Sequence, residues 1–481
     1  MFYRRRSSLV MPRTSPGFFF SRSEARRIFH LAAPVFFAQL SQMLMGVVDT
    51  VMTGHYRTTD MAAVAVAASI WVPVSLFGIG VMLALTPLIA QRLGAGDRKS
   101  VPHLLRQGVM LALALSVPLI ATLLFFARNI HWFGLEHELA RIAAGFLRAI
   151  ACGLPGFLLF IAVRGLLDGD ARTRPAMLIS FCGLLLNIPC NYLLIYGRCG
   201  LPELGGIGSG VSTAIAHWFM GAALVCYTRG SASYKDLRPL YAPLWRGLPG
   251  APRLDLCLMA RILRIGVPGA LSLLFEVTCF TICPLLLAPL GTTVVAGHQV
   301  AMSVTNLLFM IPLSLCITST IRVGRCLGEG NPVAGQTVSW TALGSGFVMA
   351  CATCTGIILL RYEITGLYTN DPQVRELAAT LLLYTAAFQL VDAVQIICLG
   401  SLRGYNDTLF ISMASFGGYC CLGLPLGIVL ARTDLLAPQM GAAGFWAAFV
   451  ICLSSLALVF LWRLRRLHRL GPQAVRRLIE H

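Results

Sequence analysis

The stretch Ile262–Leu290 reads ILRIGVPGALSLLFEVTCFTICPLLLAPL, and it decides the fold. Apart from Arg264 near its start and Glu276 at its centre, it contains no charged residue. About 20 apolar residues are enough to cross roughly 30 Å of hydrocarbon as an α-helix. Because the apolar run is continuous and does not alternate with polar residues, it favours a helix over a strand of a membrane barrel. We therefore predict that this stretch crosses a membrane as a helix.

Apolar runs of this kind recur along the whole chain. Hydrophobic residues make up 57% of the sequence and charged residues only 12%, whereas a soluble protein of this length carries roughly 25% charged residues. The class we expect is therefore an all-α integral membrane protein with twelve transmembrane helices. The predicted spans are Ile28–Thr53, Asp60–Ala90, His103–Ala127, Ala140–Val163, Pro175–Tyr196, Gly205–Tyr227, Ile262–Leu290, Thr293–Ser319, Val338–Leu360, Arg375–Gly400, Leu409–Leu430 and Gly441–Trp462.

The basic residues are distributed unequally between the two sides of the predicted membrane. If the helices alternate in direction, 30 of the 38 Lys and Arg residues fall on one side, and that side includes residues 1–27, 229–261 and 463–481. Positive residues accumulate in cytoplasmic loops, so both termini and the basic linker 229–261 are predicted to be cytoplasmic. The net charge of +18 thus follows the membrane topology, and we do not expect a nucleic-acid partner.

An internal repeat organises these spans. The motif Ile265-Gly-Val-Pro268 has a counterpart 234 positions earlier in Leu31-Ala-Ala-Pro34, and the same offset relates Leu93-Gly-Ala-Gly-Asp97 to Leu327-Gly-Glu-Gly-Asn331. Each half contains six spans, an even number, so both halves enter the membrane from the same side. We predict two parallel six-helix repeats, an N-terminal bundle of residues 28–228 and a C-terminal bundle of residues 262–462.

Three of the 20 acidic residues lie within the apolar runs, namely Asp49, Glu276 and Asp392. A charge at the centre of a bilayer costs about 2.5–3.5 kcal/mol even on insertion scales, so such residues face a cavity or a partner. No Lys or Arg is expected deep enough to neutralise them. They are candidates for binding a proton, Na⁺ or a cationic substrate. The alternative is a protonated structural acid bonded between helices, and for Asp49, near the outer end of its span, a residue that reaches the interface.

The repeat makes the two halves chemically different, because Gln42 occupies the position equivalent to Glu276. If Glu276 and Asp392 lie together, they share a proton or take up Na⁺ between their oxygens. Asn187 and Asn191 are four residues apart and share a helix face. With Thr213 and Gln39 they are candidates for a polar cavity wall, and interhelical hydrogen bonding is the alternative. The apolar candidates for a substrate cavity are Phe275, Phe309, Met310, Trp71 and Met82, with plain packing as the alternative.

The sequence contains no nucleotide-binding loop and no His-Glu-x-x-His zinc motif. We therefore expect an ion gradient to supply the energy, with Na⁺ or H⁺ as the coupling ion and with no cofactor.

Several motifs together resemble the MATE (multidrug and toxic compound extrusion) family, in particular its bacterial NorM-like branch. They occur in the same order along nearly the whole chain, which makes the resemblance specific. The stretches are Gly46-Val-Val-Asp49-Thr, Leu184-Leu-Leu-Asn187-Ile-Pro189, Glu203-Leu-Gly-Gly-Ile-Gly208, Phe275-Glu276-Val-Thr278, Val294-Val-Ala-Gly-His298-Gln299-Val, Ile321-Arg322-Val-Gly324, Val391-Asp392-Ala-Val-Gln395 and Gly400-Ser-Leu-Arg403-Gly-Tyr405.

The resemblance implies a V-shaped pair of bundles that exports cationic amphipathic molecules against inward Na⁺ or H⁺ by alternating access. It implies a monomeric transporter, not an enzyme, in the bacterial cytoplasmic (inner) membrane. The coupling cation, or a Na⁺ ion, is expected at Glu276 and Asp392, and a role is assigned to Asp49. Another branch of the family carries an acid at the position of Asn191, and this chain departs from that branch in the first-half site where the acid binds a proton.

Three other functions remain open from the residues alone. A flippase for lipid-linked precursors is expected to need a larger cationic cavity. A membrane-embedded enzyme is expected to need a His/Asp or Cys/His group at one depth, whereas His298 and His217 are isolated in the sequence. A transporter of the major facilitator type is expected to show a charged cytoplasmic loop between helices that is not evident here.

Overall fold

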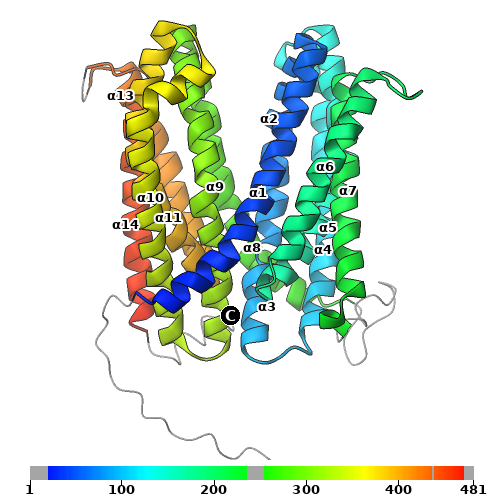
Figure 1. Cartoon of the computed structure of the whole chain (residues 1–481), viewed down its shortest axis with the longest axis vertical. Coiled ribbons are helices and arrows are strands. Elements are labelled where there is room, and N and C mark those ends of the chain that lie inside the picture. Colours follow the sequence, from blue (N-terminus) through cyan, green and yellow to red (C-terminus); the bar gives the residue numbers. More distant parts are fainter. Residues whose placement is uncertain (1–19, 236–253, 436–437, 471–481) are drawn as a thin grey trace, which may run out of the picture.

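The computed structural model describes residues 20–235, 254–435 and 438–470, and the chain within these ranges is helical (Figure 1). Twelve spans in the described residues are long and apolar enough to cross a membrane, as predicted. In the first half they are α1 Arg22–Tyr56, α2 Thr58–Met82 continued by α3 Leu85–Gly94, α4 Val101–Arg128, α5 His137–Gly169, α6 Arg174–Tyr196 and α7 Gly206–Gly230. In the second half they are α8 Leu256–Leu287, α9 Thr292–Gly328, α10 Pro332–Tyr368, α11 Pro372–Gly404, the composite α12 Thr408–Ser415, η4 Phe416–Gly423 and α13 Leu424–Arg432, and α14 Ala442–His468. Short 3₁₀ turns occur at η1 Ile130–Phe133 and η3 Ala288–Leu290.

Most helices extend beyond the predicted span at one end or at both. The eighth span was predicted to end at Ser319, and α9 continues to Gly328, because helical hydrogen bonds persist where the apolar run stops. Polar caps mark the true ends. The Asp255 carboxylate accepts the Leu258 N–H at 3.0 Å, and this bond holds the pKa of Asp255 below its usual range. The basic ends 1–19 and 471–481 and most of the predicted linker 229–261 lie outside the described residues.

The two halves form two bundles that meet at the end of the molecule carrying α3 and diverge toward the opposite end (Figure 1). Each bundle has its own hydrophobic core. At the meeting end a Cβ on Gly94 would collide with the Arg325 carbonyl oxygen, and a Cβ on Gly328 would collide with the Gln91 carbonyl oxygen. Both pairs of equivalent residues are related by the offset of 234, so the contact has the pseudo-twofold symmetry of the repeat. Only glycine permits so close a backbone approach.

Helix α1 connects the two bundles (Figure 1). Its residues Ile28 and Ala32 are buried in the core of the second bundle. An ion pair of 2.7 Å joins Glu24 Oε2 to Arg322 Nη2 on α9, and the Ser21 N–H donates to the Thr341 hydroxyl on α10 at 3.2 Å. The first bundle was predicted to begin at residue 28, yet the first turns of its first helix lie against the second bundle.

The eleventh span is not a uniform α-helix. Between α12 and α13 the chain forms a π-helix, η4, over Phe416–Gly423. Gly417 and Gly418 lower the cost of the wider turn, and Pro425 lacks the N–H that would bond back to residue 421. Turns of this kind occur frequently at functional sites.

Candidate functional site

A cavity of about 330 Å³ lies inside the first bundle, and Asp49 on α1 forms part of its wall. Gln42, Trp71 and Thr213 also line it. Its remaining lining is mostly apolar and comes from Met43, Met45, Gly46, Thr50, Val64, Ala68, Val72, Ser75, Phe146, Ile150, Phe157, His217 and Met220. Neither Lys nor Arg occurs in this described lining, so the cavity carries an acid without a basic residue.

The Asp49 carboxylate receives hydrogen bonds from three side chains. The Asn191 amide donates to Oδ1 at 2.6 Å, the Thr213 hydroxyl donates to Oδ2 at 2.7 Å, and the Asn187 amide donates to Oδ1 at 3.4 Å. Asn187 and Asn191 therefore stand behind the acid and not on the cavity surface. Bonds to a carboxylate are stronger than neutral ones, and these compensate for burying Asp49, which is only 7% exposed.

Aromatic rings cover another part of the cavity wall. The Phe157 and His217 rings are stacked, with centroids 4.4 Å apart and an interplanar angle of 24°. Trp71 stacks on His217 at 6.0 Å. In the described part of the chain, Gln42 Nε2 and His217 Nδ1 are buried without a hydrogen-bond partner. His217 was treated as isolated in the sequence, because three different helices are needed to assemble this stack.

Asp392 on α11 is buried in the second bundle, and Glu276 on α8 is half-buried, close enough for its charge to act on Asp392. Asp392 is 1% exposed. Ion pairs within the described residues involve other acids, such as Asp168, Glu24 and Asp407. Arg403, near the C-terminal end of α11, acts electrostatically on Glu276.

Several buried polar atoms around this acid pair have no hydrogen-bond partner among the described residues. They are Asp392 Oδ2, both amide atoms of Gln395, Gln389 Oε1 and the Tyr419 hydroxyl. An unsatisfied buried polar group costs about 1–3 kcal/mol. Gln389, Asp392 and Gln395 follow one another at a spacing of three on α11, so their side chains lie near one another on the helix surface. This spacing could have indicated that the two glutamines accompany Asp392, although they were not among the predicted site residues.

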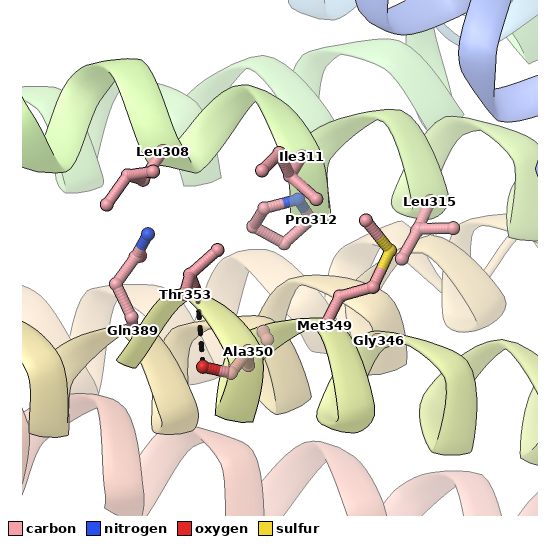
Figure 2. A pocket seen from close by; sticks show the side chains of 10 residues that line it. Leu308, Ile311, Pro312, Leu315, Gly346, Met349, Ala350, Thr353 and Gln389 are labelled. Atoms are coloured by element: carbon pink, nitrogen blue, oxygen red, sulfur yellow. Dashed lines mark hydrogen bonds between the residues drawn. The ribbon is translucent and has the colours of Figure 1, made fainter. Parts of the chain in front are cut away.

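A small cavity of about 10 Å³ lies between α9, α10 and α11 (Figure 2). The Gln389 amide points into it in Figure 2, and Ala393, the residue after Asp392, also lines it. The remaining lining residues are Leu308, Ile311, Pro312, Leu315, Gly346, Met349, Ala350 and Thr353. This volume is about that of one water-sized sphere, so the second bundle has room for a small species beside the acid-bearing face of α11.

The other predicted cavity residues lie elsewhere. Phe275 packs edge-on against Phe416, with ring centroids 5.3 Å apart. Phe309 and Met310 are half-buried on α9 in the second bundle, and neither they nor Phe275 are among the residues that line the first-bundle cavity.

Two further candidates, Met82 and Gln39, take part in packing and in a hydrogen bond between helices. Met82 is fully buried in the core of the first bundle. The Gln39 carbonyl accepts a hydrogen bond from the Arg164 guanidinium at 2.9 Å. Within the described residues there is no group of three or more His, Cys, Asp or Glu side chains that could hold a metal ion.

The fold is similar to that of known transporters. A eukaryotic MATE transporter, AtDTX14, superposes with a TM-score of 0.83 at 19% identity, over 95% of this chain and 98% of that chain. An outward-facing multidrug resistance MATE family transporter of the MOP superfamily superposes with a TM-score of 0.82 at 20% identity, over 94% and 97%. A MOP superfamily transporter from Pyrococcus furiosus, whose description reports a binding pocket of reversed polarity, superposes with a TM-score of 0.81 at 19% identity, over 94% and 97%.

The family itself is established by the sequence. The sequence model of the MatE family matches residues 34–193 and 268–429, one match in each repeat and together more than half of the chain. Twelve apolar spans, two six-helix repeats and this double match lead to one conclusion. The chain belongs to the MatE family of multi-pass membrane transporters, and it is not an enzyme.

Proposed function

We propose that this protein is a secondary multidrug exporter that exchanges organic cations for inward Na⁺ or H⁺ by alternating access. The observation that carries the proposal is the first-bundle cavity, whose wall combines the Asp49 carboxylate with aromatic rings and contains no Lys or Arg among the described residues. An acid without a fixed basic partner needs a mobile cation as its counterion. The volume of the first-bundle cavity lies at the lower end of the range for sites that bind drug-sized ligands.

The aromatic part of the cavity wall suits the apolar part of an amphipathic cation. Planar rings bind cations over their faces with about 0.5–2 kcal/mol, and Trp71 and Phe157 present such rings beside the acid. Met43, Met45 and Met220 add flexible apolar surface, which favours substrates of varied shape. These features support cationic amphipathic molecules as the substrate class.

The coupling cation is assigned to Glu276 and Asp392 in the second bundle. Two carboxyls held together at this depth repel one another when both are ionised, and a proton or Na⁺ removes that repulsion. Because substrate and coupling ion occupy different bundles, the ion acts by changing how the bundles pack. We infer that ion binding favours substrate release and the return to the opposite orientation, in which the Gly94 and Gly328 contact opens.

The orientation and location follow from the charge distribution. The basic residues favour a cytoplasmic location for the α3 end of the molecule and for both termini. We infer that the bundles, which diverge away from the α3 end in Figure 1, open toward the outside. A monomer in the bacterial inner membrane is the simplest assembly for this topology.

A flippase for lipid-linked precursors is the second candidate. It would need basic residues to bind a pyrophosphate group, and the described lining of the large first-bundle cavity contains none. This chemistry favours an exporter of cations over a flippase of anions.

Ethidium transport into inside-out proteoliposomes tests the proposal. We expect uptake when only one of two gradients, Na⁺ or H⁺, is imposed alone. The gradient that drives uptake identifies the coupling ion. Glu276→Gln and Asp392→Asn should each remove gradient-driven uptake while membrane insertion is retained. Glu363→Gln, an exposed acid on α10, is the matched control and should behave as the wild type. Wild-type uptake in both core variants, or uptake of a lipid pyrophosphate in place of ethidium, would overturn the proposal.

A further inference from the structure

Tyr419 on η4 is a buried tyrosine whose hydroxyl has no hydrogen-bond partner among the described residues. Its side chain is 1% exposed. Its ring packs in a cluster of phenylalanines, with Phe280 6.4 Å away and Phe449 and Phe388 also against Phe280. A fourth phenylalanine at position 419 would fill the same space without burying an unpaired hydroxyl. The hydroxyl therefore needs an explanation other than packing.

The position of this tyrosine relates it to the acid pair. The Cys279 thiol lies 3.9 Å from the Tyr419 carbonyl oxygen, and Cys279 follows Glu276 by three residues, about one turn of α8. The Phe280 ring lies 5.9 Å from Phe388, which precedes Asp392 by one turn of α11. Tyr419, Glu276 and Asp392 thus project from three neighbouring elements at one level of the second bundle.

Electrostatics supports the same grouping. Both Glu276 and Asp392 act on the Tyr419 phenol, so neither carboxyl is remote from it. Asp392 Oδ2 is itself buried without a partner in the described part of the chain. Two carboxyl groups and one phenol at one level of the second bundle provide oxygen atoms, which are the ligands that hard cations prefer.

The backbone around Tyr419 explains why sequence alone does not place it there. In a regular α-helix a residue is rotated by 100° from its neighbour, and the wider π-turn of Phe416–Gly423 changes that register for the residues within it. The rotation of position 419 relative to α12 is therefore set by the π-turn.

We propose that the Tyr419 hydroxyl is a third oxygen ligand for the coupling cation, beside the carboxyls of Glu276 and Asp392. The inference rests on the proposed function of that pair. When Na⁺ binds, the phenol oxygen donates a lone pair to the ion. When a proton binds, the phenol and the protonated carboxyl form a hydrogen bond, because a hydroxyl is both donor and acceptor.

Cation binding to the purified full chain tests this ligand. Tyr419→Phe keeps the ring and removes only the oxygen. We expect it to weaken Na⁺ binding about tenfold, or to shift the pH midpoint of proton release if the ion is H⁺, as for the loss of one ligand or hydrogen bond. Tyr405→Phe removes an equally buried hydroxyl near the inner end of α11 and should leave both measurements unchanged.

A second measurement on the wild-type chain covers the case in which Tyr419→Phe does not fold. With ring-labelled tyrosine, infrared difference spectra taken on adding Na⁺ or on changing pH should contain a shifted tyrosine C–O band. This band should persist in Tyr405→Phe and vanish in the Glu276→Gln, Asp392→Asn double variant. No tyrosine band in the wild type would overturn the assignment.

The outcomes separate this inference from the proposed function. If Glu276→Gln and Asp392→Asn abolish cation binding while a folded Tyr419→Phe binds as the wild type, the acid pair remains the coupling site and Tyr419 is not a ligand. If both acid variants bind and transport as the wild type, the proposed coupling site itself is wrong, and the third ligand is wrong with it.

Discussion

Asp49 is the residue on which substrate charge recognition should depend. It is the acid in the wall of the first-bundle cavity, and three side chains hold its carboxylate in place. Asp49→Asn keeps the size of the side chain and removes its negative charge. We expect at least about a tenfold loss of ethidium affinity, because charge-assisted contacts contribute roughly 1.5–3 kcal/mol. Binding to the purified protein, followed by fluorescence, measures the change.

The control for Asp49 is Asp434→Asn, which neutralises an exposed acid in the loop between α13 and α14. It should bind ethidium as the wild type does. Wild-type affinity in Asp49→Asn, with the control also unchanged, would mean that the cationic substrate finds its counter-charge elsewhere.

Trp71 should distinguish planar substrates from compact ones. Its ring stacks beside His217 and lies 6.4 Å from Phe157 in the cavity wall. Trp71→Ala should weaken ethidium binding about 5- to 30-fold, since an aromatic contact contributes about 1–2 kcal/mol, and should affect tetramethylammonium less. Competition binding compares the two cations. Trp132→Ala, at a position 63% exposed, is the control, and equal losses for both cations would contradict a stacking role.

At the scale of elements, the sequence predicts well which segments form helices, and it predicts poorly the detailed geometry of those helices. The twelve spans follow from hydropathy because hydrocarbon tolerates only long apolar helices. The π-turn at Phe416–Gly423 does not, because its wider register depends on packing around Gly417 and Gly418. Likewise Asp49, Glu276 and Asp392 stand out as charges in apolar runs, whereas His217 and Tyr419 acquire their surroundings only when separate helices meet.

The close contact between α3 and α9 gives an element-scale prediction. Gly94→Ala places a methyl group against the Arg325 carbonyl oxygen, and overpacking of this kind costs about 1–3 kcal/mol. The cost falls only on the arrangement in which the bundles meet at this end, so the equilibrium should move toward the opposite arrangement. With spin labels attached at positions 99 and 333, in place of Lys99 and Val333, double electron–electron resonance should then report a longer average distance between the labels.

The matched control is Gly356→Ala on α10, where an added methyl group meets no atom within 4 Å. It should give the wild-type distance distribution and wild-type transport. Unchanged distances in Gly94→Ala would mean that this contact relaxes without opening the bundles.

At the scale of the whole molecule, the two bundles are not independent bodies joined only by the linker. The first turns of α1 share the core of the second bundle through Ile28 and Ala32, while the rest of α1 carries Asp49 in the first bundle. The repeat could be read from the sequence, but this crossing could not, because both bundles offer similar apolar surfaces. Any rocking of the bundles must therefore be absorbed along α1 and along α8, whose residues Ile262 and Ile265 are buried in the core of the first bundle. Pro34 in α1 and Pro268 in α8 each remove one helical hydrogen bond.

Two cross-links with opposite expected effects test this mechanical picture in a cysteine-free background. A short bifunctional thiol reagent joining Ser21→Cys to Thr341→Cys ties α1 to α10, where the two residues already form a hydrogen bond. If the start of α1 moves with the second bundle, this link leaves ethidium transport intact. The same reagent joining Gln91→Cys to Asn406→Cys spans the meeting end of the bundles, where these side chains bond at 3.0 Å. That link should stop transport, and reduction should restore it, because the bundles cannot separate there. Loss of transport with the first link would show that α1 leaves the second bundle during the cycle, and transport through the second link would rule out opening at the α3 end.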